Sequence, residues 1–284
     1  MRMGAPELAP HLAFEQRTGA SRTTVSKLPC LTPVKPMNIP TPRFALLSLF
    51  APLLIVPFPA SAQSGSFIIS QHGHSVGTAI VTFNAVSEGY NSTSVIRVAM
   101  QGLNYSLSKT ERLTSANALK HVQLSAAVNG SAVSVNAAPD AAQILLNISA
   151  NGRSTTTRLA AHPAAVFLPD FDPGALDTLL ALAVSGNNRD LWAIIPKQAG
   201  SIAPIQLATY ADMQGTLDGK PIGVHHLVAT IAGAKTDLFS GPENQLLQAE
   251  LPQEGFALVR KGFVLTPPAK PSAPPQIPAQ PAQQ

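Results

Sequence analysis

Four histidines are the residues of this chain best suited to metal chemistry. His72 and His74 lie two positions apart, so in a strand they share one face, and either His225 or His226 could join them. Three imidazoles with an open fourth position form a zinc site that activates water. A metal-assisted hydrolase is therefore one hypothesis. The alternative is that His72 and His74 belong to a polar turn and that the other two lie at the rim of a sheet.

The sequence offers few other candidates for catalysis. The only cysteine is Cys30, and no His-Glu-x-x-His motif occurs. Asp170 and Asp172 have the spacing of calcium ligands, but Ala181 stands where the bidentate acid of a calcium loop belongs. We therefore expect no cofactor, and we assign no catalytic residue.

The elements that must position these residues are mostly strands. Residues 120–128 alternate apolar with polar side chains, which is typical of a half-buried strand, and Asn129-Gly130 then favours a tight hairpin turn. The same pattern recurs before Asn151-Gly152, and residues 256–265 are expected to form the closing strand. The pattern predicts a mainly β fold, in which a large curved antiparallel meander sheet, or half-barrel, has one amphipathic helix packed against it.

That helix is predicted from its end signals. Asp172 is a favourable N-cap, Pro173 fits the first helical position, and Gly186 fits the exit. The apolar residues between these ends recur at helical spacing and form one stripe, which comprises Leu176, Leu179, Leu180, Ala183 and Val184. We expect this stripe to lie against the sheet.

A concave apolar sheet face under a single helix is a natural hydrophobic pocket. The residues expected to line it are Val122, Leu124, Val133, Ile144, Leu146, Leu176, Leu180 and Trp192. Each of them fits a plain core position equally well, so both roles stay open at this stage.

The start of the chain predicts export. A basic residue, an apolar run from Phe44 to Phe58 and the sequence Ala60-Ser61-Ala62 are typical of a cleavable signal peptide over residues 37–62. Residues 1–36 are then expected to be a mis-extended, disordered leader, because Met37 makes a normal start. Cleavage near Ala62 would release a periplasmic or secreted protein, with transient contact with the secretion machinery as its consequence.

The rest of the chain is expected to hold one domain and a tail. A single β-rich domain is predicted over residues 63–265, and a disordered proline-rich tail over residues 266–284. Residues 1–62 hold six of the 19 basic and two of the 15 acidic residues, so 13 of each remain and the mature chain has no net charge. Without a basic stripe we expect no nucleic-acid partner. The apolar run is shorter than the roughly 20 residues that a stable membrane span needs.

Several segments together resemble a known kind of protein. They are the Gly-rich start Gly65–Ile69, the strand Val224–Val228, and the closing segments Leu246–Pro252 and Phe256–Arg260. With the long meander and central helix, the chain resembles uncharacterised bacterial periplasmic proteins whose curved antiparallel sheet is similar to the lipoprotein-carrier fold. The resemblance implies a half-barrel with a helix against its concave face, and in carriers of that shape the concave face shields acyl chains.

Three functions follow as expectations. The first is an exported non-enzymatic protein that binds an apolar or lipid ligand in the concave face of its sheet. The second is the metal-assisted hydrolase described above. The third is a structural envelope or adhesion module, favoured by the proline-rich tail and the neutral charge.

Overall fold

The computed structural model describes residues 63–185, 190–197 and 199–267. Backbone contacts separate residues 1–56 from residues 57–284, and all the described residues belong to the second unit. The predicted leader and signal peptide with its cleavage site, the helix exit at Gly186 and tail residues 268–284 lie outside the described residues.

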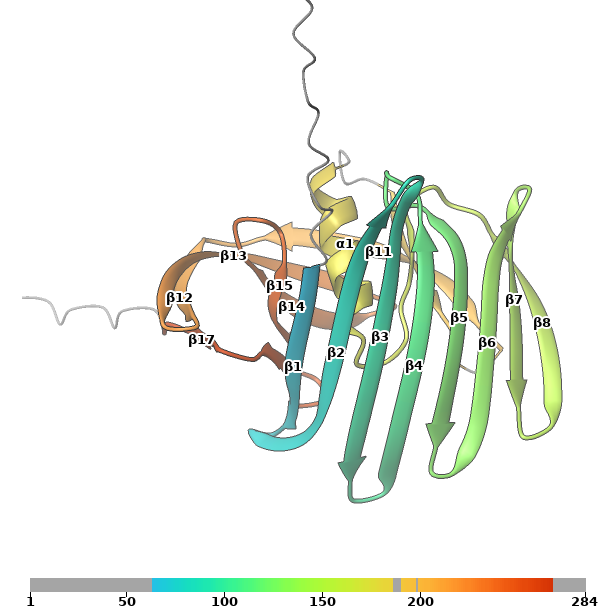
Figure 1. Ribbon diagram of the computed structural model, residues 1–284, viewed down its shortest axis with the longest axis horizontal. Coiled ribbons are helices and arrows are strands. Elements are labelled where there is room, and N and C mark those ends of the chain that lie inside the picture. Colours follow the sequence, from blue (N-terminus) through green and yellow to red (C-terminus); the bar gives the residue numbers. More distant parts are fainter. Residues whose placement is uncertain (1–62, 186–189, 198, 268–284) are drawn as a thin grey trace, which may run out of the picture. The chain divides into compact units, whose positions relative to one another are not determined.

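The first eight strands form an up-and-down antiparallel meander, as the alternation predicts. Figure 1 shows them side by side in sequence order. They are β1 (Gln63–Gln71), β2 (His74–Val86), β3 (Gly89–Met100), β4 (Leu103–Leu113), β5 (Leu119–Val128), β6 (Ser131–Asp140), β7 (Gln143–Ala150) and β8 (Arg153–Ala160). The predicted turns are confirmed: Asn129 and Gly130 have φ of 50° and 83°, and Asn151 and Gly152 have φ of 51° and 72°, the conformation that favours Asn-Gly.

The helix follows the meander. The short strand β9 (Ala165–Phe167) precedes α1 (Pro173–Ser185), and β10 (Leu191–Ile195) follows it and pairs with β9 in parallel. Asp172 Oδ1 accepts a hydrogen bond of 2.9 Å from Gly174 N, and Pro173 is the first helical residue. The predicted N-cap and helix start are therefore confirmed.

The second half of the chain extends the same sheet. Its strands are β11 (Ser201–Thr209), β12 (Met213–Leu217), β13 (Lys220–Ile231), β14 (Ala234–Ser240), β15 (Leu246–Leu251), β16 (Phe256–Arg260) and β17 (Phe263–Leu265). β1 joins the halves, because it pairs with β2 on one side and with β16 on the other. From β16 the order continues through β15, β14, β13, β11 and β10 to β9. The result is one curved, mainly antiparallel sheet that does not close, with one helix among the described residues, as predicted.

The helix is buried more completely than one apolar stripe requires. Leu176, Leu179, Leu180 and Ala183 are buried as predicted, but Val184 is 62% exposed and Leu182, outside the predicted stripe, is buried. The reason is that α1 lies between two parts of the sheet: it contacts β2 and β3 in the meander and β9 and β15 from the rest of the chain. A helix enclosed in this way has apolar contacts on most of its circumference.

A second, smaller core corrects the prediction for the end of the chain. Residues 256–265 form two strands and not one, because Gly262 turns the chain with φ of 85°. β16 stays in the main sheet, whereas β17 pairs with β12, which itself pairs with the first part of β13. Around these strands Val224, Phe239, Leu247 and Phe263 form a core separate from the main one.

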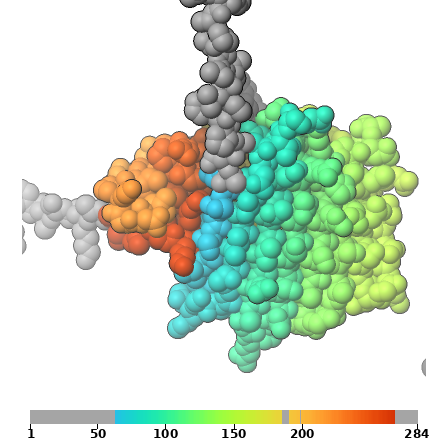
Figure 2. Space-filling view, viewed as in Figure 1, coloured from blue at the N-terminus to red at the C-terminus, as the bar shows by residue number. Residues whose placement is uncertain are grey.

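The outer face of the meander carries short polar side chains in register. Figure 2 shows this face of the meander. One row of directly opposed residues crosses all eight strands: Ser64, Thr82, Thr93, Thr110, Gln123, Asn136, Asn147 and Thr156. Neighbouring strands are ~4.8 Å apart, so the row presents uncharged polar groups at regular spacing.

Candidate functional site

The four histidines do not gather into a metal site. His72 lies in the β1–β2 turn and His74 begins β2, and the backbone N–H of His72 donates to the carbonyl of Gly255 at 2.8 Å. On β13, His225 Nδ1 lies 3.0 Å from a carboxylate oxygen of Asp212. Within the part of the chain that the structure describes, no group of three or more His, Cys, Asp or Glu side chains could hold a metal ion. The convergence that the hydrolase hypothesis needs is therefore not there.

His226 has surroundings that the sequence did not indicate. Its Nε2 lies 2.8 Å from Asp237 Oδ1, and its ring stacks on Phe239 with centroids 4.6 Å apart. The ring of Tyr210 is also close to His226, at a centroid distance of 5.0 Å. A half-buried histidine between a carboxylate and two aromatic rings is explained by packing over the second core.

The eight expected pocket residues share one core. Six of them are less than 9% exposed: Val122, Leu124, Ile144, Leu146, Leu176 and Leu180. Val133 and Trp192 are partly buried and pack against the same core, and Trp192 also stacks on His162 at 3.8 Å. Of the eight, Leu176 alone lines the cavity described next.

This cavity, of about 160 Å³, lies beneath the loop that joins β9 to α1, on the helix-covered face of the sheet. Ten of its fifteen lining residues are apolar: Leu168, Pro169, Phe171, Leu176, Ile195, Ala229, Ile231, Ala234, Leu251 and Leu258. Ala229 and Leu258 are at most 1% exposed, so the floor belongs to the main core. The loop is attached to the sheet because the N–H of Leu168 donates to the carbonyl of Ile194 at 2.9 Å.

Charged side chains stand at the mouth of the cavity. Lys197 Nζ lies 2.8 Å from Asp170 Oδ1, and both side chains are largely exposed. The hydrogen bond to Asp170 raises the pKa of Lys197, and the charge of Glu254, which also lines the cavity, adds to this rise. An apolar floor with a charged rim suits a ligand that has one apolar and one polar end.

Phe171 is held in an unusual backbone conformation at the wall of the cavity. Its φ of 57° lies in the left-handed region, which is rare for a bulky residue and costs about 1–3 kcal/mol. Its ring makes edge contacts with Phe256 at 4.8 Å and with Tyr105 at 6.0 Å. Burial raises the pKa of Tyr105, and the charges of Asp170 and Asp172 raise it further. The strained loop is thus fixed by aromatic packing.

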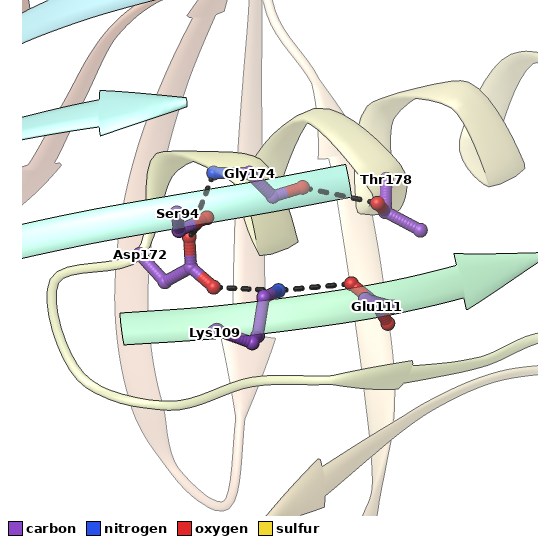
Figure 3. Close-up of polar contacts among 6 residues, drawn as sticks. All are labelled: Ser94, Lys109, Glu111, Asp172, Gly174 and Thr178. Atoms are coloured by element: carbon purple, nitrogen blue, oxygen red, sulfur yellow. Dashed lines mark hydrogen bonds and ion pairs between the residues drawn. The ribbon is translucent and has the colours of Figure 1, made fainter. Parts of the chain in front are cut away.

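A buried group of charges lies behind the same loop, as Figure 3 shows. The helix cap Asp172 accepts a hydrogen bond of 2.6 Å from Ser94 Oγ, and its other carboxylate oxygen lies 2.6 Å from Lys109 Nζ. The same ammonium donates to Glu111 Oε2 at 2.8 Å. The side chains of Lys109, Glu111 and Asp172 are all 0% exposed. We call these three residues the buried triad.

The triad contains one cation and two carboxyl groups, and this composition shifts the pKa values of Glu111 and Lys109. Burial raises the pKa of Glu111, Lys109 opposes the rise, and Asp172 adds to it. Burial alone would lower the pKa of Lys109, but the charges of Asp172 and Glu111 outweigh it and raise the pKa. The charges of Asp172 and Glu111 thus favour the cationic form of Lys109.

The triad positions the helix. Gly174 approaches the sheet so closely that an added Cβ would lie 2.7 Å from both Ser94 Oγ and Val81 Cγ2. Thr178 Oγ1 donates to the carbonyl of Gly174 at 3.0 Å and ties the first turn together. Since no member of the triad reaches solvent, we assign it to anchoring α1 and the cavity loop on β3 and β4.

One signal in the sequence could have revealed the triad. Lys109 and Glu111 stand at the same alternation positions as Leu107 and Leu113 in β4, and all four side chains are buried on the inward face. Two charged residues at inward positions of a strand require a buried partner.

Comparisons with known proteins add nothing to this picture: no family model, no curated protein and no solved structure matches the chain. Within the described residues no helix combines the length and hydropathy that a membrane crossing needs.

Proposed function

We propose that the protein is exported and that, without catalysing a reaction, it binds the apolar end of a lipid or another small apolar ligand in the cavity beneath the Leu168–Asp172 loop. The observation that carries this proposal is the combination of ten apolar lining residues with Lys197, Asp170 and Glu254 at the rim. The resemblance to the lipoprotein-carrier fold supports the same class of ligand.

The volume of the cavity limits the ligand. An apolar cavity of roughly 150 Å³ accommodates benzene, and drug-sized ligands need about 300 Å³ or more. The 160 Å³ here therefore fit a ring or a short alkyl segment. For about eight buried heavy atoms at ~0.6 kcal/mol each, within the range of ligand efficiencies, the expected Kd is about 0.3 mM.

Titration calorimetry with benzene, toluene and linear alkanols tests the binding. Ala234→Leu, which adds a side chain at the exposed edge of the cavity, should weaken binding at least tenfold. Ala132→Leu on the exposed face of β6 is the matched control and should leave binding unchanged. Absence of saturable binding by every one of these compounds would refute the proposed function.

Export is tested separately by sequencing the N-terminus of the protein recovered from expressing cells. The proposal expects Gln63 as the first residue. An intact leader on the accumulated protein would contradict it.

A second candidate function, a structural or adhesive module of the envelope, is favoured by the polar row on the outer face. The eight residues of this row are polar and uncharged, and they lie opposite one another across all eight strands of the meander. Thr110→Lys combined with Asn136→Lys should release the protein from the cell-envelope fraction, whereas Ser201→Lys on β11 should not. If the wild type, the double variant and Ser201→Lys all sediment equally with the cell-envelope fraction, the outer face does not have this role.

A further inference from the structure

A second cavity, of about 370 Å³, lies beside the C-terminal half of α1 and shares no lining residue with the first. It is bordered by Gln63, Phe83, Tyr90, Asn117, Asp177, Thr178, Ala181, Val184, Glu243, Asn244 and Gln245. These residues come from β1, β2, β3, α1 and two turns. Its volume falls in the range of about 300–1,000 Å³ that small-molecule sites occupy.

The first of the two turns is rigid. Thr114 Oγ1 accepts hydrogen bonds from the N–H groups of Ala116 at 3.2 Å and Ala118 at 3.0 Å. The N–H of Asn117 donates to the carbonyl of Thr114 at 3.0 Å. Asn117 itself has φ of 59°, so its side chain is set on a fixed, left-handed backbone position.

The second turn has the same character. The N–H of Gly241 donates to the carbonyl of Gln245, and the N–H of Asn244 donates to the carbonyl of Gly241, both at 2.9 Å. Gln245 Oε1 accepts a hydrogen bond of 3.0 Å from the N–H of Glu243, which orients its side-chain amide. Asn244 has φ of 60°. Both turns therefore have a hydrogen-bonded backbone, and the Gln245 amide is oriented before a ligand arrives, which lowers the entropy cost of binding.

The lining groups specify the chemistry of the ligand. Four side-chain amides each offer donors and an acceptor: Gln63, Asn117, Asn244 and Gln245. Phe83 and Tyr90 supply aromatic surface, and Asp177 and Glu243 supply carboxyl groups. No Lys, Arg or His is among the described residues that line this cavity, so an anionic ligand would have no cation to pair with.

Asp177 adds a group that can serve as donor or acceptor. One of its carboxyl oxygens accepts a hydrogen bond of 2.6 Å from the N–H of Leu246. Burial raises the pKa of Asp177 to about 7, against the opposing hydrogen bond from Leu246. Near neutral pH the carboxyl group is therefore present in both protonation states.

We propose that this cavity binds a neutral sugar. Sugar hydroxyls both donate and accept, so they can satisfy amides and carboxyl groups together, and the C–H face of a sugar ring can cover an aromatic side chain. An organic cation would suit the two carboxyl groups, but it offers no acceptor to the amide N–H groups. An alkyl chain would leave all the polar groups unpaired. This inference does not rest on the apolar site proposed above.

The proposal is tested by adding sugars to the full chain and following its backbone amide signals by NMR. The probes are glucose, galactose, N-acetylglucosamine, maltose and cellobiose, with tetramethylammonium as the cationic comparison. We expect at least one sugar to cause saturable shifts at Asn117, Asp177 and Asn244.

Two variants locate the site. Tyr90→Ala should weaken sugar binding about tenfold, because an aromatic contact is lost, and Tyr210→Ala, another exposed tyrosine that does not line the cavity, is its control. Asn244→Gly keeps the left-handed turn, which glycine adopts freely, and removes only the amide, so it should weaken binding in a folded protein. The proposal is overturned if none of the sugars binds, if both variants bind as the wild type does, or if tetramethylammonium binds more tightly than every sugar.

Discussion

Replacing Lys109 by Met tests whether the buried triad holds the helix on the sheet. Methionine has nearly the same length and fills the same space, so the substitution removes the ammonium and leaves little cavity. What remains is a pair of buried carboxyl groups, Glu111 and Asp172, which lie 2.8 and 2.6 Å from Lys109 Nζ in the native protein.

The expected loss of stability is large. Removing one partner of a buried ion pair costs about 3–5 kcal/mol, because the other charge stays buried without compensation. For a domain of about 200 residues this lowers Tm by about 6–20 °C. The loss also depends on pH. Lys109 is what lowers the pKa of Glu111, so in the variant this pKa rises further and the folded state binds a proton more tightly than the unfolded state. Stability of the variant therefore falls as pH rises above the ordinary pKa of 4.5.

Urea unfolding at pH 5 and pH 8 measures both effects. The matched control is Lys120→Met, which breaks a pair of similar length, 3.0 Å from Lys120 Nζ to Glu88 Oε2, whose side chains are 41% and 81% exposed. That control should cost far less than Lys109→Met, because solvent screens an exposed pair. Adding Glu111→Gln to Lys109→Met removes one of the unpaired acids and should recover part of the loss. If Lys109→Met at pH 8 loses no more than Lys120→Met, the buried triad does not stabilise the fold and our reasoning is wrong.

Three further predictions concern single positions. Gly174→Ala should destabilise the protein by about 1–3 kcal/mol in urea unfolding, because its Cβ would meet Ser94 and Val81 at 2.7 Å; a neutral effect would show that the helix can shift away. Between pH 4 and pH 7 the folded protein keeps a proton on Asp177 that the unfolded chain releases, so its stability should fall as pH rises. The fall is at most about 4 kcal/mol for a pKa raised from 3.8 to about 7, and Asp177→Asn should abolish it. An unchanged pH profile in the variant would contradict that assignment. Ala232→Asn should stabilise the protein by about 1 kcal/mol and so raise Tm slightly, because Ala232 has φ of 50° before Gly233 in a hairpin turn, a conformation that asparagine adopts more readily than alanine. A lower Tm would refute this prediction.

The features predicted correctly from the sequence are local ones. The alternation of residues 120–128 and the Asn129-Gly130 turn both act within a few residues, so they can be recognised without knowing what the strand pairs with. The start of α1 at Asp172 and Pro173 is equally local, because a cap bonds to the first turn of its own helix. The mainly β class with one helix follows from adding such signals along the chain.

The errors and omissions come from contacts between distant segments. The turn at Gly262 is local, but Phe263–Leu265 after it pairs with β12 and not with a neighbour in sequence, so this pairing could not be predicted. Val184 fits the helical stripe by spacing, but the sheet leaves it exposed. The carboxylate partners of His225 and His226 come from Asp212 and Asp237, residues that hairpin pairing brings close.

The amino-acid sequence by itself determined the strands, their turns and the start of the helix, because these depend on side-chain periodicity and on backbone preferences of neighbouring residues. Only the tertiary structure decided which side chains meet. Ser94 and Asp172 are 78 positions apart in the chain, but in the folded protein Ser94 Oγ lies 2.6 Å from Asp172 Oδ1. The curvature of the sheet encloses α1 and leaves one cavity at each end of the helix. Long-range pairing and packing are set by the whole chain folding at once, so no local pattern encodes them.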